Sequence, residues 1–204
     1  LFATGVNTMT VSPTNPDSVF INVRNSRNGT THGIYISVDA GDTWNVTNFN
    51  PTILGWGGMG TNRQIYQVIY HPTVPGLMFI GTNEGLFRST DNLNTWTNPI
   101  ATLDFQTIAF HPTNPSIIYA QTSNNNSAIY VSTDGGVSFN LSSTIAGNSS
   151  SIKLSTTAAC PTCVYVGSSD GIWKSTDEGM NFTLLSNPGI SNFGAFAVSD
   201  IDTN

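Results

Sequence analysis

The sequence contains few charged side chains. Only 9% of its 204 residues are Asp, Glu, Lys or Arg, against about a quarter in an ordinary soluble domain. The six Lys and Arg residues are scattered, and the net charge is −6. Phosphate binding needs clustered cations, so we predict no nucleic-acid partner. A surface that is polar but largely uncharged favours a secreted protein in an extracellular or periplasmic setting.

Long apolar runs and helical periodicity are also missing. No stretch approaches the roughly 20 apolar residues that span a bilayer, so no membrane insertion is predicted. No stretch carries a convincing helical period either, which excludes helical bundles. The chain starts at Leu1 with no signal peptide, and we expect a processed or excised segment of a longer product.

Cysteine occurs only twice, as Cys160 and Cys163 in CPTC. Such a pair can be a redox motif, half of a zinc site or a local disulfide. Zinc would need two more ligands, and the three histidines lie in unrelated parts of the sequence. No helix follows the pair, as a thioredoxin-like motif requires. We therefore predict a disulfide, with free thiols as the alternative, and neither a metal nor a cofactor.

Repetition is the strongest feature of the sequence. The octapeptides SVDAGDTW, STDNLNTW, STDGGVSF and STDEGMNF begin at residues 37, 89, 132 and 175. Their aspartates are separated by 52, 43 and 43 residues. Catalytic residues are normally needed once, so a motif repeated at a nearly fixed interval indicates architecture.

The same succession of short strands precedes each octapeptide. The third repeat reads FQTIAF, the turn HPTNPS, IIYAQT and AIYVS, with SFNLS after the octapeptide, and the fourth reads SIKLS, the turn TTAACPT, CVYVG and GIWKS. Four strands per unit of about 43 residues match a propeller blade. We predict an all-β propeller of four-stranded antiparallel blades, four blades plus the first strand of a fifth. Within a single segment, 1–204, the blades span about 5–50, 63–100, 104–146 and 150–188, and 193–199 starts a further blade.

Each octapeptide is expected to form the turn between the third and fourth strands. Its Asp can accept backbone N–H bonds within the turn, and Gly41, Gly135 or Gly179 permits positive φ. The second copy has Leu93 instead, so its turn is expected to be less regular. His71 and His111 precede Pro in equivalent turns and are expected to be structural. The predicted structural residues of the octapeptides are Asp39, Trp44, Asp91, Trp96, Asp134, Phe139, Asp177 and Phe182.

The pattern Ser-x-Asp-x-Gly-x-Thr-Trp resembles the Asp-box, or BNR repeat. Asp-boxes occur in propellers of sialidases, xyloglucan-cleaving glycoside hydrolases, sortilin-type receptors and photosystem assembly factors. HPTNPSIIYA and GLFRSTDNLNTW are similar to the hydrolase and sortilin-like groups, and the resemblance covers all four repeats. It implies ligand binding at the rim opposite the Asp-boxes. The arginine cluster and Arg-Ile-Pro motif of sialidases are not evident.

The long connection NFNPTILGWGGMGTNRQ lies on that opposite rim and is the main candidate for binding. Trp56, flanked by glycines, could stack on a sugar, or it could fold back and fill a gap between blades. The loop NSRNGTTH adds Arg27 and His32 to the same face. The candidate ligand-binding residues are Trp56, Arg63, Glu84, Asp104 and Asp170.

Two classes of function are compatible with these features. The first is a secreted binding or structural propeller that holds a glycan, a protein or copies of itself, and is no enzyme. The alternative is a glycoside hydrolase of the xyloglucan-cleaving type, or a fragment of one, with Glu84 and Asp104 as a carboxylate pair roughly 5–10 Å apart. The strand left over at 193–199 should pair with further blades of the same polypeptide or with another copy of the chain.

Overall fold

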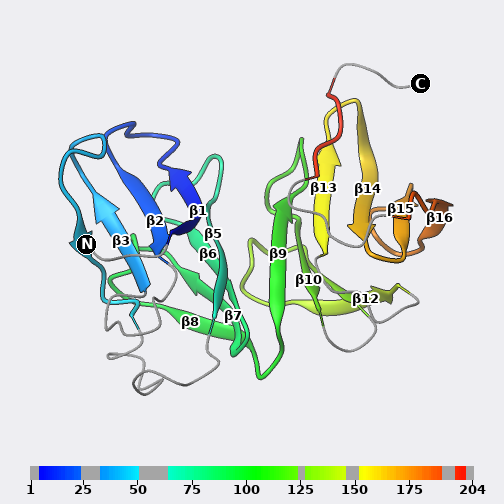
Figure 1. Cartoon of the computed structure of the whole chain (residues 1–204), viewed down its shortest axis with the longest axis horizontal. Coiled ribbons are helices and arrows are strands. Elements are labelled where there is room, and N and C mark those ends of the chain that lie inside the picture. Colours follow the sequence, from blue (N-terminus) through cyan, green and yellow to red (C-terminus); the bar gives the residue numbers. More distant parts are fainter. Residues whose placement is uncertain are drawn as a thin grey trace. The chain divides into compact units, whose positions relative to one another are not determined.

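A computed structural model describes residues 5–23, 33–50, 64–123, 127–145, 152–189 and 196–200. The chain divides into two compact units, Leu1–Thr102 and Leu103–Asn204. Each unit contains two four-stranded antiparallel sheets, and no helix occurs in the described ranges. The four sheets are called blades 1 to 4 in chain order (Figure 1).

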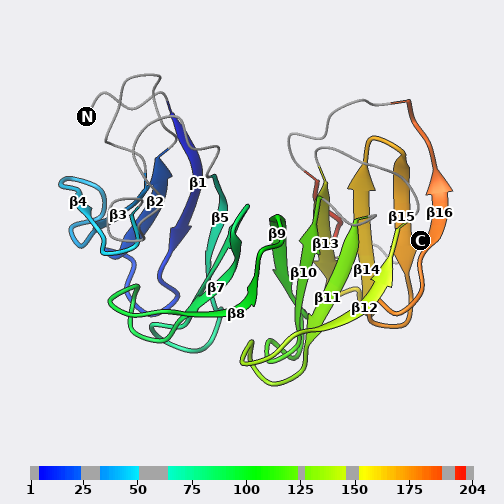
Figure 2. The same ribbon diagram turned by 90° about the horizontal axis from the view of Figure 1, so that it is seen from below.

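The first unit contains blades 1 and 2. Their strands follow one another in space as they do in sequence, and β1 lies beside β5. Figure 2 shows the two sheets with these first strands next to each other. The strands are β1 (Val6–Val11), β2 (Val19–Val23), β3 (Gly33–Ser37), β4 (Asn45–Val46), β5 (Ile65–Tyr70), β6 (Met78–Thr82), β7 (Gly85–Ser89) and β8 (Thr97–Ala101).

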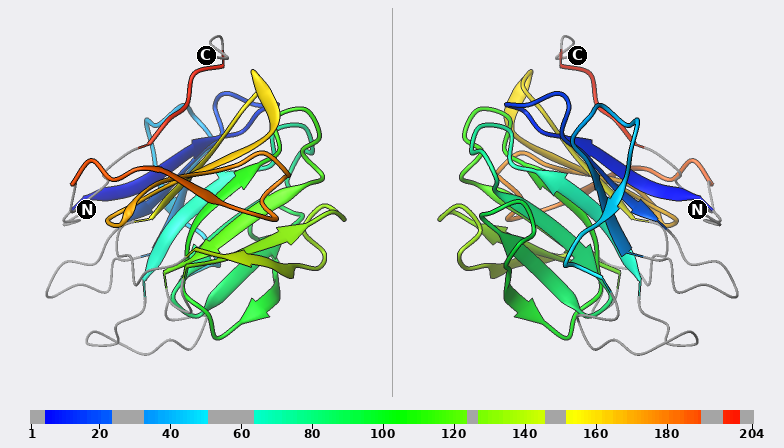
Figure 3. Two further views of the ribbon diagram at one scale, coloured as in Figure 1. Left: turned by 90° about the vertical axis from the view of Figure 1, so that its right-hand side faces the viewer. Right: turned by 90° about the vertical axis from the view of Figure 1, so that its left-hand side faces the viewer.

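The second unit contains blades 3 and 4, built in the same way, with β9 beside β13. Twisted strands are visible in Figure 3, as expected for sheets of L-amino acids. The strands are β9 (Phe105–Phe110), β10 (Ile118–Thr122), β11 (Ala128–Ser132), β12 (Asn140–Thr144), β13 (Lys153–Thr157), β14 (Cys160–Ser168), β15 (Gly171–Ser175) and β16 (Thr183–Ser186). The predicted all-β architecture of four-stranded antiparallel blades is confirmed.

Each unit buries its own apolar cluster between its two blades. In the first unit Phe20 of β2 packs edge-on against Tyr70 of β5, with ring centroids 5.5 Å apart. In the second unit Tyr119 of β10 shares a cluster with Leu154 and Val166 of blade 4. Burial of such side chains stabilises a fold by about 1.5–3 kcal/mol each, so the blades of a unit hold each other in place.

Blade 4 differs from the expectation in its first connection. The sequence suggested the turn TTAACPT followed by a strand at CVYVG, but β13 ends at Thr157 and β14 begins at Cys160. Thr157 pairs with Cys160 and Thr156 pairs with Val164, so residues 161–163 bulge out of the ladder. The predicted disulfide is confirmed: Cys160 and Cys163 are bonded, with Cα atoms 5.2 Å apart. The bond closes this bulge, which explains why a strand can include both cysteines.

The predicted first strand of a further blade lies only partly within the described ranges. Of residues 196–200, none is assigned to a strand, but the Thr157 hydroxyl donates to the Ser199 carbonyl at 2.6 Å. The Ala158 N–H donates to Asp200 Oδ1 at 2.9 Å. This segment therefore lies beside the end of β13. Within the described part of the chain there is no helix long and apolar enough to cross a bilayer.

Candidate functional site

The four octapeptides form turns with the same hydrogen bonds, and we call them the Ser-x-Asp turns (residues 37–44, 89–96, 132–139 and 175–182). In the first, the Ser37 hydroxyl donates to Asp39 Oδ1 at 2.6 Å and accepts the Gly41 N–H at 2.8 Å. The Thr43 N–H donates to the same carboxylate at 2.8 Å. Each Asp thus accepts bonds on both sides of the turn, which closes it locally.

Two consecutive residues of positive φ follow each Asp. Asn92 and Leu93 have φ values of 57° and 65° in the second turn. The Leu93 N–H still donates to Ser89 Oγ at 2.9 Å, as Gly41 does to Ser37. The expectation of a less regular second turn is therefore wrong, because the hydrogen bonds of Ser89 and Asp91 impose the shape on a leucine. In the third turn Gly136 takes the place equivalent to Gly41, directly after Gly135.

The turn carboxylates are stabilised as anions. The hydroxyls of Ser37 and Thr43 lower the pKa of Asp39 from 3.8 to about 2. The side chains of Asn181 and Ser175 lower the pKa of Asp177 to about 2. Hydrogen bonds also hold the pKa of Asp91 and of Asp134 below the usual value. The largest contribution comes from Thr95 for Asp91 and from Ser138 for Asp134. The four aspartates are therefore engaged by their own turns.

The aromatic residue that ends a turn packs into the unit in at least two copies. The Trp96 ring lies 5.2 Å from the Phe49 ring, centroid to centroid, against the cluster of the first unit. Phe182 packs against the cluster of the second unit. Each of these clusters draws on both blades of its unit, so Trp96 and Phe182 connect the turns to the packing between blades.

His71 and His111 hold the connection between the first and second strands of blades 2 and 3. His111 Nδ1 accepts the N–H groups of Thr113 and Asn114 at 3.3 and 3.1 Å. His71 Nδ1 accepts the equivalent bonds from Thr73 and Val74 at 3.3 and 3.1 Å. Both side chains are buried. The geometry accounts for each histidine as a turn acceptor.

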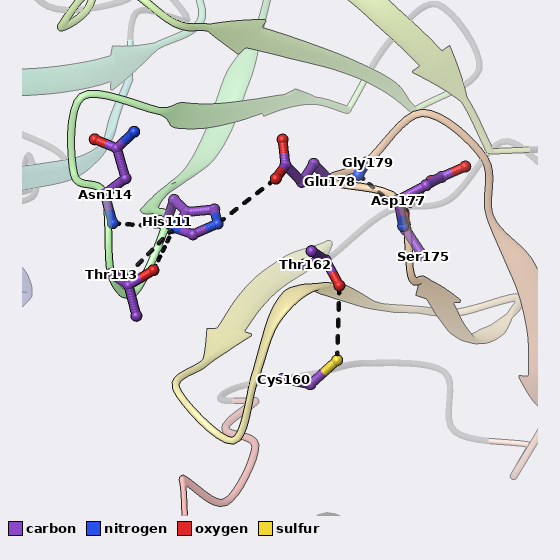
Figure 4. A network of polar contacts seen from close by, with 9 residues as sticks. All are labelled: His111, Thr113, Asn114, Cys160, Thr162, Ser175, Asp177, Glu178 and Gly179. Atoms are coloured by element: carbon purple, nitrogen blue, oxygen red, sulfur yellow. Dashed lines mark hydrogen bonds and ion pairs between the residues drawn. The ribbon is translucent and has the colours of Figure 1, made fainter.

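The Ser-x-Asp turn of blade 4 also contacts blade 3. Glu178 Oε1 lies 4.0 Å from His111 Nε2 (Figure 4). The hydroxyls of Ser142 and Ser143 on β12 donate to the Gly179 carbonyl at 3.0 and 2.8 Å. This set of contacts is called the blade 3–4 seam. The seam could not be predicted from the repeats, because the position of Glu178 carries Ala, Asn and Gly in the other copies.

Three of the candidate ligand residues lie in described turns. Glu84 lies between β6 and β7 in the first unit, and the Thr102 N–H donates to its carbonyl at 3.1 Å. Asp104 precedes β9 and Asp170 lies between β14 and β15, both in the second unit. Trp56, Arg63, Arg27 and His32 lie outside the described residues. Within the described ranges no three His, Cys, Asp or Glu side chains gather as a metal site requires.

Comparison with solved structures shows the fold. An ancestral GH74 enzyme has a TM-score of 0.71 at 22% identity, over 91% of this chain and 25% of its own. The GH74 xyloglucanase from Xanthomonas campestris has a TM-score of 0.62 at 17% identity, over 89% and 31%. An auxiliary nutrient binding protein from Bacteroides thetaiotaomicron has a TM-score of 0.62 at 12% identity, over 91% and 43%. The predicted β-propeller class is confirmed.

The likeness is confined to three-dimensional structure. No family model matches the sequence, and no curated protein matches it. The chain spans between a quarter and less than half of the length of the three solved structures described above. At these identities the comparison supports the fold and leaves activity to be argued from the residues.

Proposed function

We propose that this chain is part of a secreted Asp-box β-propeller that acts as a binding or structural scaffold. It holds a glycan, a protein or another copy of itself through the rim opposite the Ser-x-Asp turns. The observation that carries the proposal is the engagement of Asp39, Asp91, Asp134 and Asp177 by their own turns. The repeated carboxylates are thereby used for architecture and not as an array of catalytic groups, which supports placing ligand contacts on the opposite rim.

The disulfide supports an extracellular or periplasmic location. Structural disulfides persist in oxidising compartments and are rare in the cytosol. The Cys160–Cys163 bond and the low content of charged residues both agree with secretion.

The segment 196–200 supports membership of a larger propeller or assembly. It lies beside the end of β13, where Thr157 and the following Ala158 contact Ser199 and Asp200. Within the second unit, β9 lies beside β13 in the same manner, with Thr156 Oγ1 donating to the Phe110 carbonyl at 2.8 Å. Residues 193–199 would then begin a further blade, completed by the same polypeptide or by another copy.

A binding screen tests the scaffold proposal. The protein is applied to an array of plant and bacterial glycans, and any ligand found is titrated against the Trp56→Ala and Arg63→Ala variants. Both should bind at least about tenfold more weakly if the ring and the guanidinium contact the ligand. Asp42→Ala, on the rim of the Ser-x-Asp turns, is the matched control and should bind normally. Equal losses in all three variants would contradict the assignment of the rim.

A glycoside hydrolase is the second candidate, favoured by the structural likeness to GH74 enzymes. Glu84 and Asp104 would then act as acid and base or nucleophile across the scissile bond. Incubation with xyloglucan, followed by reducing-end analysis, separates the two proposals. Hydrolysis that is lost in Glu84→Gln and in Asp104→Asn but kept in Asp42→Asn would establish the enzyme. Binding without hydrolysis would leave the scaffold.

A further inference from the structure

Each Ser-x-Asp turn is anchored within its own blade by one backbone hydrogen bond. The residue after the Asp donates its N–H to a carbonyl of the first connection in blades 1 to 3, and to a carbonyl at the start of the second strand in blade 4. In blade 3 the Gly135 N–H donates to the Ser116 carbonyl at 3.0 Å, and in blade 4 the Glu178 N–H donates to the Thr162 carbonyl at 2.9 Å. The equivalent acceptors in blades 1 and 2 are Asp17 and Gly76.

The anchor of blade 4 is held by different means from the anchor of blade 3. In blade 3, His111 Nδ1 accepts the N–H groups of Thr113 and Asn114, and backbone hydrogen bonds from Ile117 to Asn114 and from His111 to Ile117 close the rest of the connection. In blade 4 the connection is a two-residue turn, and Thr162 lies in the bulge between Cys160 and Cys163. Two residues three apart in an extended strand are about 10 Å apart, whereas these Cα atoms are 5.2 Å apart. The disulfide thus keeps the bulge folded and Thr162 in place.

The turn anchored on Thr162 is the one that contacts blade 3. Glu178 approaches His111, and the Gly179 carbonyl accepts the hydroxyls of Ser142 and Ser143. Figure 4 shows Cys160, Thr162 and this turn close together, with Glu178 directed toward His111. A continuous series of covalent and hydrogen bonds therefore connects the disulfide to the blade 3–4 seam.

We propose that the Cys160–Cys163 disulfide is a redox-sensitive latch for the blade 3–4 seam, acting through the Thr162 carbonyl. The reductant is a thiol. Cys160 is a partly exposed residue and Cys163 is buried. The thiolate of the reductant therefore attacks the Cys160 sulfur, and Cys163 leaves as a thiolate. A second thiolate attacks the thiol's sulfur in the mixed disulfide, releasing Cys160 and the oxidised reductant. The bulge is then free to extend, and the Glu178 N–H loses its acceptor.

Amide hydrogen exchange of the whole chain, followed by NMR with and without dithiothreitol, tests the latch. The Glu178 amide should exchange about tenfold faster after reduction, the change that follows from losing one hydrogen bond. The Gly135 amide is the matched control, because its anchor in the same unit contains no disulfide. Its rate should stay the same. The Cys160→Ser/Cys163→Ser variant should behave as the reduced protein with or without dithiothreitol.

Two results would overturn the latch. The first is an unchanged Glu178 rate in protein whose mass confirms complete reduction. The second is equal acceleration of Glu178 and Gly135, which would indicate general loosening of the unit. Reduction of the native protein gives the answer even where the double variant does not fold.

Discussion

The Ser-x-Asp turns of blades 2 and 4 have the same backbone hydrogen bonds but differ in the size of the side chain at one position. Leu93 and Gly179 occupy the same place, and their N–H groups donate to Ser89 and Ser175 at the same distance of 2.9 Å. Leu93 is 1% exposed and belongs to the cluster that contains Phe20. Gly179 has no side chain, and the ring of Tyr119 lies close to it: Tyr119 Cε1 would be 3.5 Å from a Cβ added at Gly179.

The backbone of the turn and the packing between the two blades of a unit are therefore determined by different residues. Phe20 and Tyr119 are each the second residue of the second strand of a blade, and both are completely buried. In the first unit the leucine belongs to the buried cluster that contains the phenylalanine, whereas in the second unit a larger tyrosine lies beside the glycine. The Ser and Asp hydrogen bonds set the backbone, and the neighbouring blade decides which side chain fits.

The largest expected effect comes from moving the leucine to the wrong unit. Gly179→Leu places a long side chain at φ +84°, against Tyr119 and Ile129. Overpacking and the cost of positive φ should together lower the free energy of unfolding by about 2–5 kcal/mol. Urea unfolding measures this loss. A loss below about 0.5 kcal/mol would mean that Tyr119 does not occupy the space.

The reverse change should be milder. Leu93→Gly removes a buried side chain, at about 2–5 kcal/mol, but relieves a leucine held at φ +65°, which returns about 1–2 kcal/mol. The expected net loss is about 1–3 kcal/mol in the same urea experiment. Leu93→Ala keeps the positive φ and is the control. It should be less stable than Leu93→Gly, and the opposite order would contradict the strain at this residue.

Much of this architecture could be predicted from the sequence. Short β-branched and aromatic runs predicted the strands, and the octapeptide predicted the turns, because both signals are local. The role of His111 followed from its place before Pro112 in a repeated turn. The disulfide was predicted from the spacing of two cysteines and the lack of other ligands.

The remainder depends on contacts that are remote in sequence. The octapeptide alone suggested that Leu93 would disturb its turn, but the buried cluster around Phe20 accommodates that side chain. The short hairpin of blade 4 was hidden because a register change places Cys160 opposite Thr157. Glu178 could not be connected with His111 without the position of the neighbouring blade. The pairing of Glu84 with Asp104 remains a prediction, because the two residues belong to different units.

A smaller effect is expected from replacing Asp134, which makes none of the contacts of the blade 3–4 seam. Asp134→Ala removes the acceptor of the Ser138 N–H and hydroxyl groups. The loss should be about 1–2 kcal/mol in urea unfolding, comparable to the loss of a helix cap. Asp42→Ala removes an exposed carboxylate of the first turn as a control, and should change stability by less than about 0.5 kcal/mol. Equal losses would show that general charge, and not the turn bonds, is responsible.

The smallest effect concerns protonation of the aspartates in the Ser-x-Asp turns. It is absent at neutral pH and appears only in acid. Hydrogen bonds lower the pKa of Asp39 and Asp177 from 3.8 to about 2. A lowered pKa in the folded protein means that these bonds contribute fully above pH about 4, and that the contribution is lost as the pH falls toward about 2. The urea midpoint of unfolding should therefore be constant from neutral pH down to about 5 and should decline between about 4 and 2. Asp134→Asn removes one of the four carboxylates and should decline less steeply. An identical slope in the variant, or a midpoint that does not change in acid, would contradict the assignment of these carboxylates as anionic turn acceptors.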